Sequence, residues 1–296
     1  MPMWIPITLF AAGFQTARTA MQQRLRALLS VSGAGFVRYV YGAPLSLSAV
    51  GVAVLIGVRL PHVPTHFWPI ITWAGIAQII GTICLIRAFD ARDYAIGTVY
   101  SKTEVVQVAV FSLVFLGESL RPLGWVAVAI CMVGIVVLAS KGRRLSRATL
   151  RDPAGLYGLA AGGLFGLAAV GIRAASKSLT DSPTVMRAIV TLAAMNTIQT
   201  VVHGSYLLAR EREQIGLAFK HWRSSSIVGV LSVCGSACWA IAFTLQNAAR
   251  VRTFGQIELL FTFVVAHVWL HERHSRYEIA ASGLVLTGVV GVMLFG

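Results

Sequence analysis

Residues 94–122 have the sequence YAIGTVYSKTEVVQVAVFSLVFLGESLRP, which places one carboxylate, Glu104, inside a long apolar segment. A similar segment at residues 251–276 has the sequence VRTFGQIELLFTFVVAHVWLHERHSR. Its acid Glu258 follows Glu104 by 154 positions. An acid in the hydrocarbon of a membrane costs at least ~2.5 kcal/mol on insertion scales. Two acids at equivalent positions therefore indicate a function.

The composition is that of a membrane protein. Of the 296 residues, 56% are hydrophobic and 12% are charged, and the mean hydropathy is +0.74. A soluble domain carries roughly 25% charged residues. The net charge of +14 does not indicate nucleic-acid binding, because the Lys and Arg residues lie mainly in short segments between apolar blocks. That distribution is typical of topology signals.

The apolar blocks predict an all-α protein with about ten membrane-spanning helices. A bilayer core requires about 20 apolar residues per helix, and a helix satisfies its backbone polar groups internally. The predicted spans are residues 3–21, 34–57, 67–89, 94–116, 121–140, 153–175, 183–208, 224–247, 253–271 and 276–296. We find no nucleotide-binding loop, nucleophile elbow or metal motif, so we expect neither catalytic residues nor a cofactor or metal.

An internal repeat divides the chain. The polar connector at residues 141–152 has the sequence KGRRLSRATLRD, and we place the two repeats at residues 1–145 and 153–296, with residues 146–152 between them. Pairs of identical residues 154 positions apart include Trp68 and Trp222, Gly75 and Gly229, Cys84 and Cys238, Glu118 and Glu272, and Gly134 and Gly288. Because each repeat has five spans, the second must enter the membrane from the opposite side. Secondary transporters commonly have this inverted arrangement, with a substrate site near the midplane between the repeats.

The chain resembles the EamA-like branch of the drug/metabolite transporter superfamily over nearly its whole length. The resemblance rests on ten spans in two halves, on the helix that ends in Leu116-Gly117-Glu118 after an intramembrane acid, and on the Arg that opens the second helix of each half (Arg38, Arg187). The family often has a Pro after the acid, where this chain has Val105 and Leu259. The resemblance implies transport of small metabolites, with the first and sixth helices lining the cavity.

The strongest site candidates surround the two acids. In a regular helix, Tyr100, Glu104 and Gln107 share one face, so Glu104 is expected to bind a proton or a cationic substrate, or to form a structural pair between helices. Glu258, with Gln256 two positions earlier, has the same alternatives. Lys102 lies about 200° around the helix from Glu104 and cannot pair with it on one face. It therefore snorkels, lines the pore, or meets an acid on another helix.

Other polar residues interrupt the remaining spans. Gln15 and Arg18 in the first span and Arg173 in the sixth are candidate substrate contacts, because an Arg fork suits a carboxylate or phosphate; both arginines lie in loops if those spans end early. Gln78 and Trp239 are further candidates, although Trp239 is equally well explained as a core aromatic. We interpret Arg38 and Arg187 as interfacial anchors. The spacing of His267, His271 and His274 permits zinc, but polar residues ending a span explain it better.

Together these features predict a secondary transporter that exports a small metabolite by alternating access, with proton coupling through Glu104 and Glu258. The expected partners are the metabolite, the lipid bilayer and protons, with a homodimer left open and no nucleic acid. The expected location is the bacterial plasma (inner) membrane, and the Lys/Arg distribution places both termini outside. The alternatives are a membrane enzyme acting on a lipid-linked substrate and a non-transporting scaffold.

Overall fold

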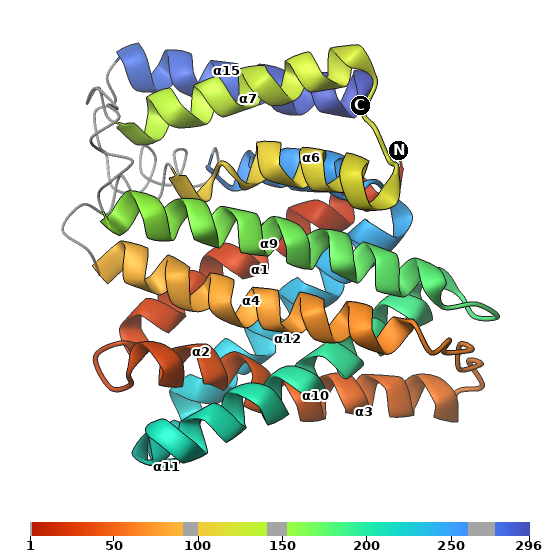
Figure 1. Ribbon diagram of the computed structural model, residues 1–296, viewed down its shortest axis with the longest axis vertical. Helices are drawn as coiled ribbons and strands as arrows, with labels where there is room; N and C mark the ends of the chain where they lie inside the picture. Colours follow the sequence, from red (N-terminus) through yellow and green to blue (C-terminus); the bar gives the residue numbers. More distant parts are fainter. Residues whose placement is uncertain (1, 91–99, 141–152, 260–275) are drawn as a thin grey trace. The chain divides into compact units, whose positions relative to one another are not determined.

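The computed structural model describes residues 2–90, 100–140, 153–259 and 276–296, and these residues are almost entirely helical (Figure 1). Their helices are α1 (Trp4–Leu25), α2 (Val31–Val40), α3 (Gly42–Leu55), α4 (Phe67–Asp90), α6 (Glu104–Leu116), α7 (Pro122–Ser140), α9 (Pro153–Ser178), α10 (Thr184–Arg210), α11 (Arg212–Lys220), α12 (Trp222–Leu245), α13 (Ala248–Gly255) and α15 (Arg276–Phe295). Within this described part, the β structure consists of one isolated bridge between His62 and Thr180.

The helices confirm an all-α membrane protein. In the described part of the chain, five segments are long and apolar enough to cross a membrane: Val31–Leu55, Phe67–Ala88, Pro153–Ser178, Thr184–Arg210 and Trp222–Leu245. The same part contains three shorter apolar helices: Glu104–Leu116, Pro122–Leu138 and Ile279–Phe295. The number of ten spans stays a prediction. The short helix α11, in a connector after the seventh predicted span, was not predicted, because its 9 residues are too few to span a membrane and include polar ones at both ends.

The helices form two compact units, and each unit takes segments from both halves of the sequence. Unit 1 comprises Met1–Ile83 and Ala168–Gln246, and unit 2 comprises Cys84–Leu167 and Asn247–Gly296. These units describe which helices pack together. The predicted repeats describe duplication along the sequence, and their boundaries stay a prediction.

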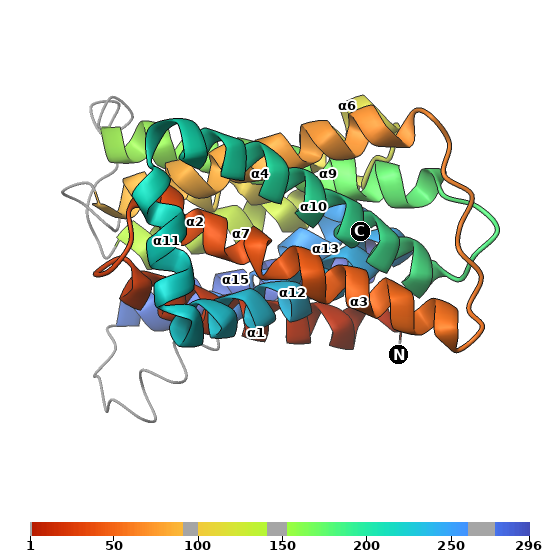
Figure 2. The same ribbon diagram turned by 90° about the horizontal axis from the view of Figure 1, so that it is seen from below.

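In unit 1, α1 packs along α12, and α10 packs against α2, α3 and α12 (Figures 1 and 2). Polar side chains join α2 and α10 to α4. The Arg38 guanidinium donates to the Thr82 hydroxyl at 2.9 Å, and the buried Gln199 amide donates to the Gly75 carbonyl at 3.1 Å. Arg38 is only 5% exposed. Its interpretation as an interfacial anchor was therefore wrong, because a partner on α4 allows the charge to lie inside the protein.

In unit 2, α7 packs along α15 and α6 packs against α13. The first contact is very close: a Cβ added at Gly288 would lie 2.5 Å from the Cys131 backbone nitrogen, and one added at Gly134 would lie 2.6 Å from the Val285 nitrogen. Small residues let membrane helices approach in this way. Helix α6 ends at Leu116 and is capped by Gly117. The φ of Gly117 is 65°, in the left-handed region that glycine adopts without strain.

Candidate functional site

The predicted site residues lie in two groups, one in each unit. Unit 2 holds Tyr100, Lys102, Glu104, Gln107, Gln256 and Glu258. Unit 1 holds Gln15, Arg18, Gln78, Arg173 and Trp239.

Both acid-bearing helices of unit 2 are interrupted beside the acid. Residues 100–101 are helical, residues 102–103 form a turn, and α6 begins at Glu104. In the second half, α13 ends at Gly255, Gln256 forms a turn, and residues 257–259 are helical. The turns are closed by short-range bonds, from the Thr103 amide to the Tyr100 carbonyl at 3.2 Å and from the Gln256 amide to the Thr253 carbonyl at 3.1 Å. The two interruptions occupy equivalent positions of the predicted repeat.

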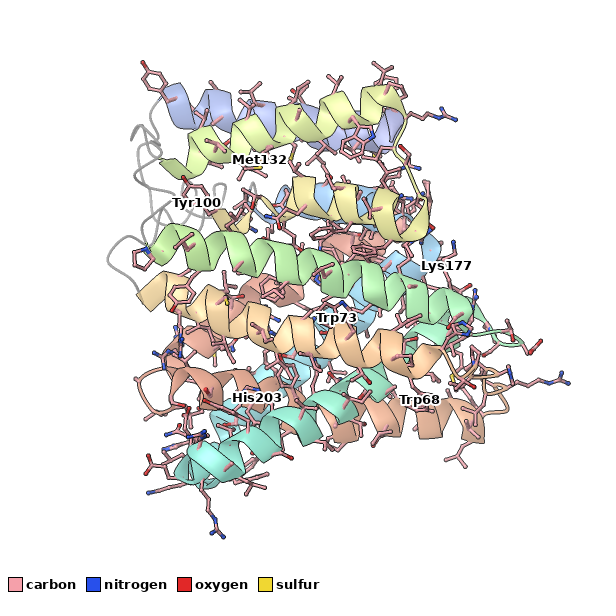
Figure 3. The ribbon with its side chains drawn as sticks, in the orientation of Figure 1. Trp68, Trp73, Tyr100, Met132, Lys177 and His203 are labelled. Carbon is pink, nitrogen blue, oxygen red and sulfur yellow. The ribbon has the colours of Figure 1, made fainter. Side chains whose placement is uncertain are left out.

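This finding corrects the prediction of one continuous helix through Glu104. The acid begins a helix instead of lying in the middle of one. The turn separates Tyr100 from Glu104 and Gln107, which both lie in α6. Tyr100 is buried (Figure 3). Gln107 donates to the Thr103 hydroxyl at 2.8 Å and to the Leu159 carbonyl of α9 at 3.4 Å.

Two ion pairs cross between the interrupted helices. The Arg252 Nε lies 2.9 Å from the Glu104 Oε1, and these side chains are 11% and 10% exposed. The Lys102 ammonium donates to Glu258, and those side chains are 17% and 12% exposed. Each acid thus faces a base from the opposite half of the sequence. Of the three alternatives for Lys102, the structure shows the one in which it meets an acid on another helix.

The acids follow the predicted repeat, whereas their bases do not. Glu104 and Glu258 are equivalent at the 154-residue offset, but the equivalent of Lys102 is Gln256 and that of Arg252 is Thr98. Gln256 is buried and donates its amide to the Arg252 carbonyl at 3.3 Å. Arg252 was not among the predicted site residues, because it comes directly before the predicted span at residues 253–271. Its position six residues before Glu258, in the same apolar segment, was the available signal.

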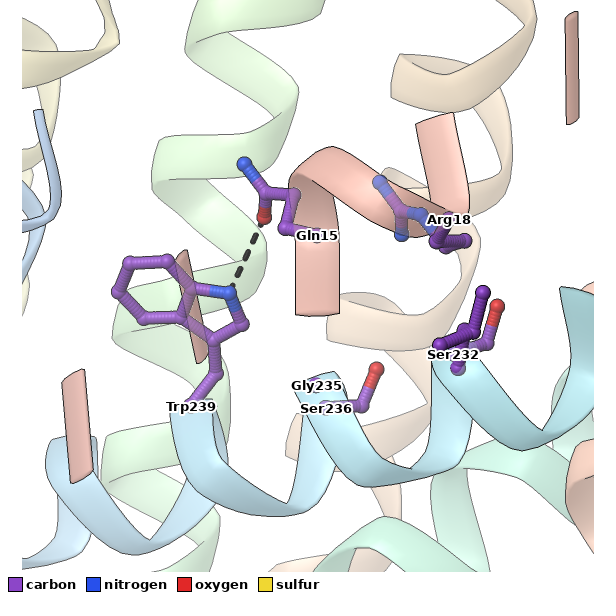
Figure 4. Close-up of a pocket in the computed structure, with 7 residues that line it drawn as sticks. Gln15, Arg18, Ser232, Gly235, Ser236 and Trp239 are labelled. Atoms are coloured by element: carbon purple, nitrogen blue, oxygen red, sulfur yellow. Dashed lines mark hydrogen bonds between the residues drawn. The ribbon is translucent and has the colours of Figure 1, made fainter. Parts of the chain in front are cut away.

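In unit 1, α1 and α12 enclose a small pocket (Figure 4). Three predicted residues, Gln15, Arg18 and Trp239, line it with Leu231, Ser232, Gly235 and Ser236. The Trp239 indole Nε1 donates to the Gln15 amide oxygen at 3.0 Å. The ring of Trp239 stacks on Phe243, with 5.6 Å between centroids. The pocket has a volume of about 10 Å³, which is the space of about one water molecule.

Arg173 and Gln78 are not among the residues that line this pocket. Arg173 is buried in α9, and its Nη1 donates to the Phe243 and Gln246 carbonyls at 2.5 Å each. It therefore binds the C-terminal end of α12, and this contact explains its place in an apolar helix. The Gln78 amide oxygen accepts from Gln199 at 2.9 Å, a bond between α4 and α10.

Sequence reasoning also missed His203 on α10 (Figure 3). Its ring is buried beside Phe36 and Tyr39, with centroid distances of 5.9 and 6.0 Å. Neither ring nitrogen has a hydrogen-bond partner among the residues that the structure describes. Glu272 and the three predicted histidines of the same segment, His267, His271 and His274, lie outside the described residues. Among the described ones, no group of three or more His, Cys, Asp or Glu residues could hold a metal ion.

Comparisons with known proteins support a transporter. The sequence model of the EamA-like transporter family matches residues 2–140 and again residues 153–294. A relative from a Sinorhizobium species, described as an uncharacterized transporter in the cobO 3' region, is 31% identical over 78 residues. This match covers 26% of the chain and 55% of the relative, so the chain spans about half of that relative's length. A crystal structure described only as that of a protein is 16% identical, with a TM-score of 0.71, and the match covers 98% of this chain and 97% of that one. This last likeness shows the fold.

Proposed function

Because this chain belongs to the EamA-like transporter family, we propose that it is a secondary transporter that exports a small metabolite by alternating access. Members of this family are transporters, and the relative from Sinorhizobium is described as one. Both facts favour transport over a membrane enzyme or a scaffold. The proposal places the protein in a bacterial plasma membrane and includes a homodimer as its assembly.

The proposed architecture is a pair of inverted five-helix repeats, at residues 1–145 and 153–296. The family match supports it, because it occurs once in each half of the chain. An odd number of spans per repeat reverses the orientation of the second copy. In transporters of this kind, the substrate site lies near the middle of the membrane, and the repeats rock around it.

The observation that carries the proposal is the pair of cross-helix ion pairs beside the two helix interruptions. Interrupted helices are a recurring feature of substrate and ion sites in transporters. Ionisable residues inside a membrane segment usually mark a pathway or a proton relay. Here the four charged side chains are at most 17% exposed, and their formal charges sum to zero. Four side chains whose charges balance can stay buried when the transporter is open to one side of the membrane. They can pair differently when it is open to the other side.

We assign proton binding to the two carboxylates. A proton that binds Glu104 neutralises the carboxylate and removes its attraction for the Arg252 guanidinium. The same relation holds between Glu258 and Lys102. An anionic group of the substrate can then take the place of the carboxylate beside the base that faced it. Coupling follows if the protonated and the substrate-bound forms favour different facings, since a ligand shifts an equilibrium only by its differential affinity.

A flux measurement in liposomes tests this proposal. The purified protein is reconstituted with a pH-sensitive dye inside, and amino acids, sugars, nucleotides and cationic drugs are added outside, one class at a time. We expect at least one class to change the internal pH with wild-type protein. Glu104→Gln and Glu258→Gln are each expected to reduce that change.

The matched control is Glu213→Gln, which alters an exposed acid on α11 and is expected to keep the wild-type response. An unchanged dye response in both Gln variants would refute proton coupling through these acids. Radiolabelled members of the same four classes separate coupling from transport. If none of them moves across the membrane with wild-type protein, the proposed transport function is wrong.

A further inference from the structure

We infer that the pocket between α1 and α12 is an oxyanion subsite, which binds one oxygen of a carboxylate or phosphate group carried by the metabolite. This inference rests on the proposed transport function for its biological role, but the binding itself is a separate property. It concerns the unit 1 pocket of Figure 4 and not the ion pairs of unit 2.

The polar residues of the pocket come from one face of each helix. Gln15 and Arg18 are three positions apart on α1, and Ser232 and Ser236 are four positions apart on α12. Such spacings bring side chains to the same side of a helix. Gly235 adds no side chain between them, and Trp239 donates to Gln15 beside them. The lining of the pocket thus includes one arginine from α1 and two serines from α12.

Ser232 is the observation that points to a ligand. The residue is only 5% exposed, and its Oγ has no hydrogen-bond partner among the residues that the structure describes. Thr244 on the same helix behaves differently, because its hydroxyl donates to the Ala240 carbonyl at 2.7 Å. An unsatisfied buried hydroxyl lowers stability, since its bond to water is lost without replacement. A ligand oxygen in the pocket supplies the missing acceptor.

Charge and size define the class of ligand. Arg18 brings a permanent positive charge to the lining of the pocket. Guanidinium bonds to carboxylate or phosphate oxygens are among the stronger hydrogen bonds in proteins. The pocket volume of about 10 Å³ admits one oxygen atom and not a whole metabolite. The remainder of the molecule must therefore lie outside the pocket.

A thermal-unfolding titration of the detergent-purified full chain tests the inference. Sodium acetate and sodium phosphate are the probes, and sodium chloride at the same ionic strength and pH is the reference. A bound ligand raises the unfolding midpoint in a saturable way. We expect saturation with at least one oxyanion and none with chloride. A response to acetate alone assigns the carboxylate class, and a response to phosphate alone assigns the phosphate class.

Two variants and two controls locate the binding. Arg18→Gln and Ser232→Ala are each expected to raise the half-saturating oxyanion concentration, by about tenfold or more for the loss of the charged donor. The controls are Arg24→Gln, an exposed cation at the end of α1, and Ser225→Ala. Ser225 is also buried on α12, and its Oγ also has no partner among the described residues, but it does not line the pocket. Both controls are expected to keep wild-type affinity.

The inference is overturned if chloride gives the same response as the oxyanions, or if Ser232→Ala and a folded Arg18 variant keep wild-type affinity. Arg18→Met, which also removes the charge, replaces Arg18→Gln if the latter does not fold. The liposome assay separates this outcome from the failure of the proposed function. Flux without oxyanion binding removes the subsite alone, whereas oxyanion binding without flux of any class removes the transport function alone.

Discussion

Replacing Arg252 by Gln is expected to destabilise unit 2 by leaving the Glu104 carboxylate buried without its cation. The two charges are 2.9 Å apart and about 10% exposed. At an effective dielectric constant of about 20, this distance corresponds to an attraction of about 6 kcal/mol. The cost of removing the charges from water offsets much of that attraction. Removing one member of a buried pair typically costs about 3–5 kcal/mol, and we expect Arg252→Gln to lower the free energy of unfolding by this amount.

The double variant separates a coupled pair from two independent charges. With Glu104→Gln added to Arg252→Gln, neither charge remains, so no carboxylate is left buried alone. We expect the double variant to be more stable than the sum of the two single changes predicts, by at least about 2 kcal/mol. Reversible unfolding of the detergent-purified protein in a denaturant titration gives the four free energies that the comparison requires.

A surface pair provides the control. Arg212 and Glu213 on α11 are both exposed, and Arg212→Gln, Glu213→Gln and their combination are expected to change stability by no more than about 0.5 kcal/mol. Strict additivity of Arg252→Gln and Glu104→Gln, within the error of the titration, would refute the reasoning. The carboxylate and guanidinium would then contribute separately, and the interrupted helices would not be joined through them.

Three further changes test the packing, by the same unfolding titration. Gly288→Ala places a methyl group against the backbone of α7 and is expected to lower the free energy of unfolding by about 1–3 kcal/mol. Its control is Gly283→Ala on the same helix, where an added Cβ has nothing within 4 Å, and this change is expected to be neutral or slightly stabilising. Equal effects of the two changes would contradict the close contact. Gly117→Ala is expected to cost roughly 1–2 kcal/mol because of the left-handed backbone, and no loss would contradict that conformation. Arg173→Met removes the donor to two carbonyls at the end of α12 and is expected to cost about 2–5 kcal/mol, whereas a loss below 1 kcal/mol would contradict this role.

Apolar blocks were sufficient to predict most helices. The predicted span at residues 183–208 corresponds to Thr184–Arg210, and that at residues 67–89 corresponds to Phe67–Asp90. This agreement has a simple cause, since a helix is the economical way to satisfy a backbone in hydrocarbon. The turn at residues 102–103 was not predicted, because no Pro or Gly marks it. A sequence pattern does not reveal an interruption that local residue preferences do not require.

The candidate site shows the same limit. Glu104 and Glu258 could be selected from the sequence because acids are rare in apolar segments. Which base each acid meets could not be predicted, because pairing depends on which helices meet. Arg252 resembled a loop cation, and Lys102 had three possible surroundings. Arg38 had an equally ordinary explanation until Thr82 of α4 was seen beside it. Each error concerned a long-range contact and not a residue type.

The ion pairs change how the two acids should be understood in the proposed cycle. An unpaired acid in a membrane could take up a proton without further consequence, but each of these acids faces a base. Protonation therefore alters two groups at once, and the released base must find an anion or water. The bases also differ, since Arg presents a planar fork whereas Lys presents a compact ammonium. Under the proposed mechanism, the repeat supplies two equivalent acids, and the unequal bases make the two sites inequivalent. Glu104→Gln and Glu258→Gln should therefore differ in how strongly they reduce proton-coupled flux in liposomes, and equal effects would contradict this assignment.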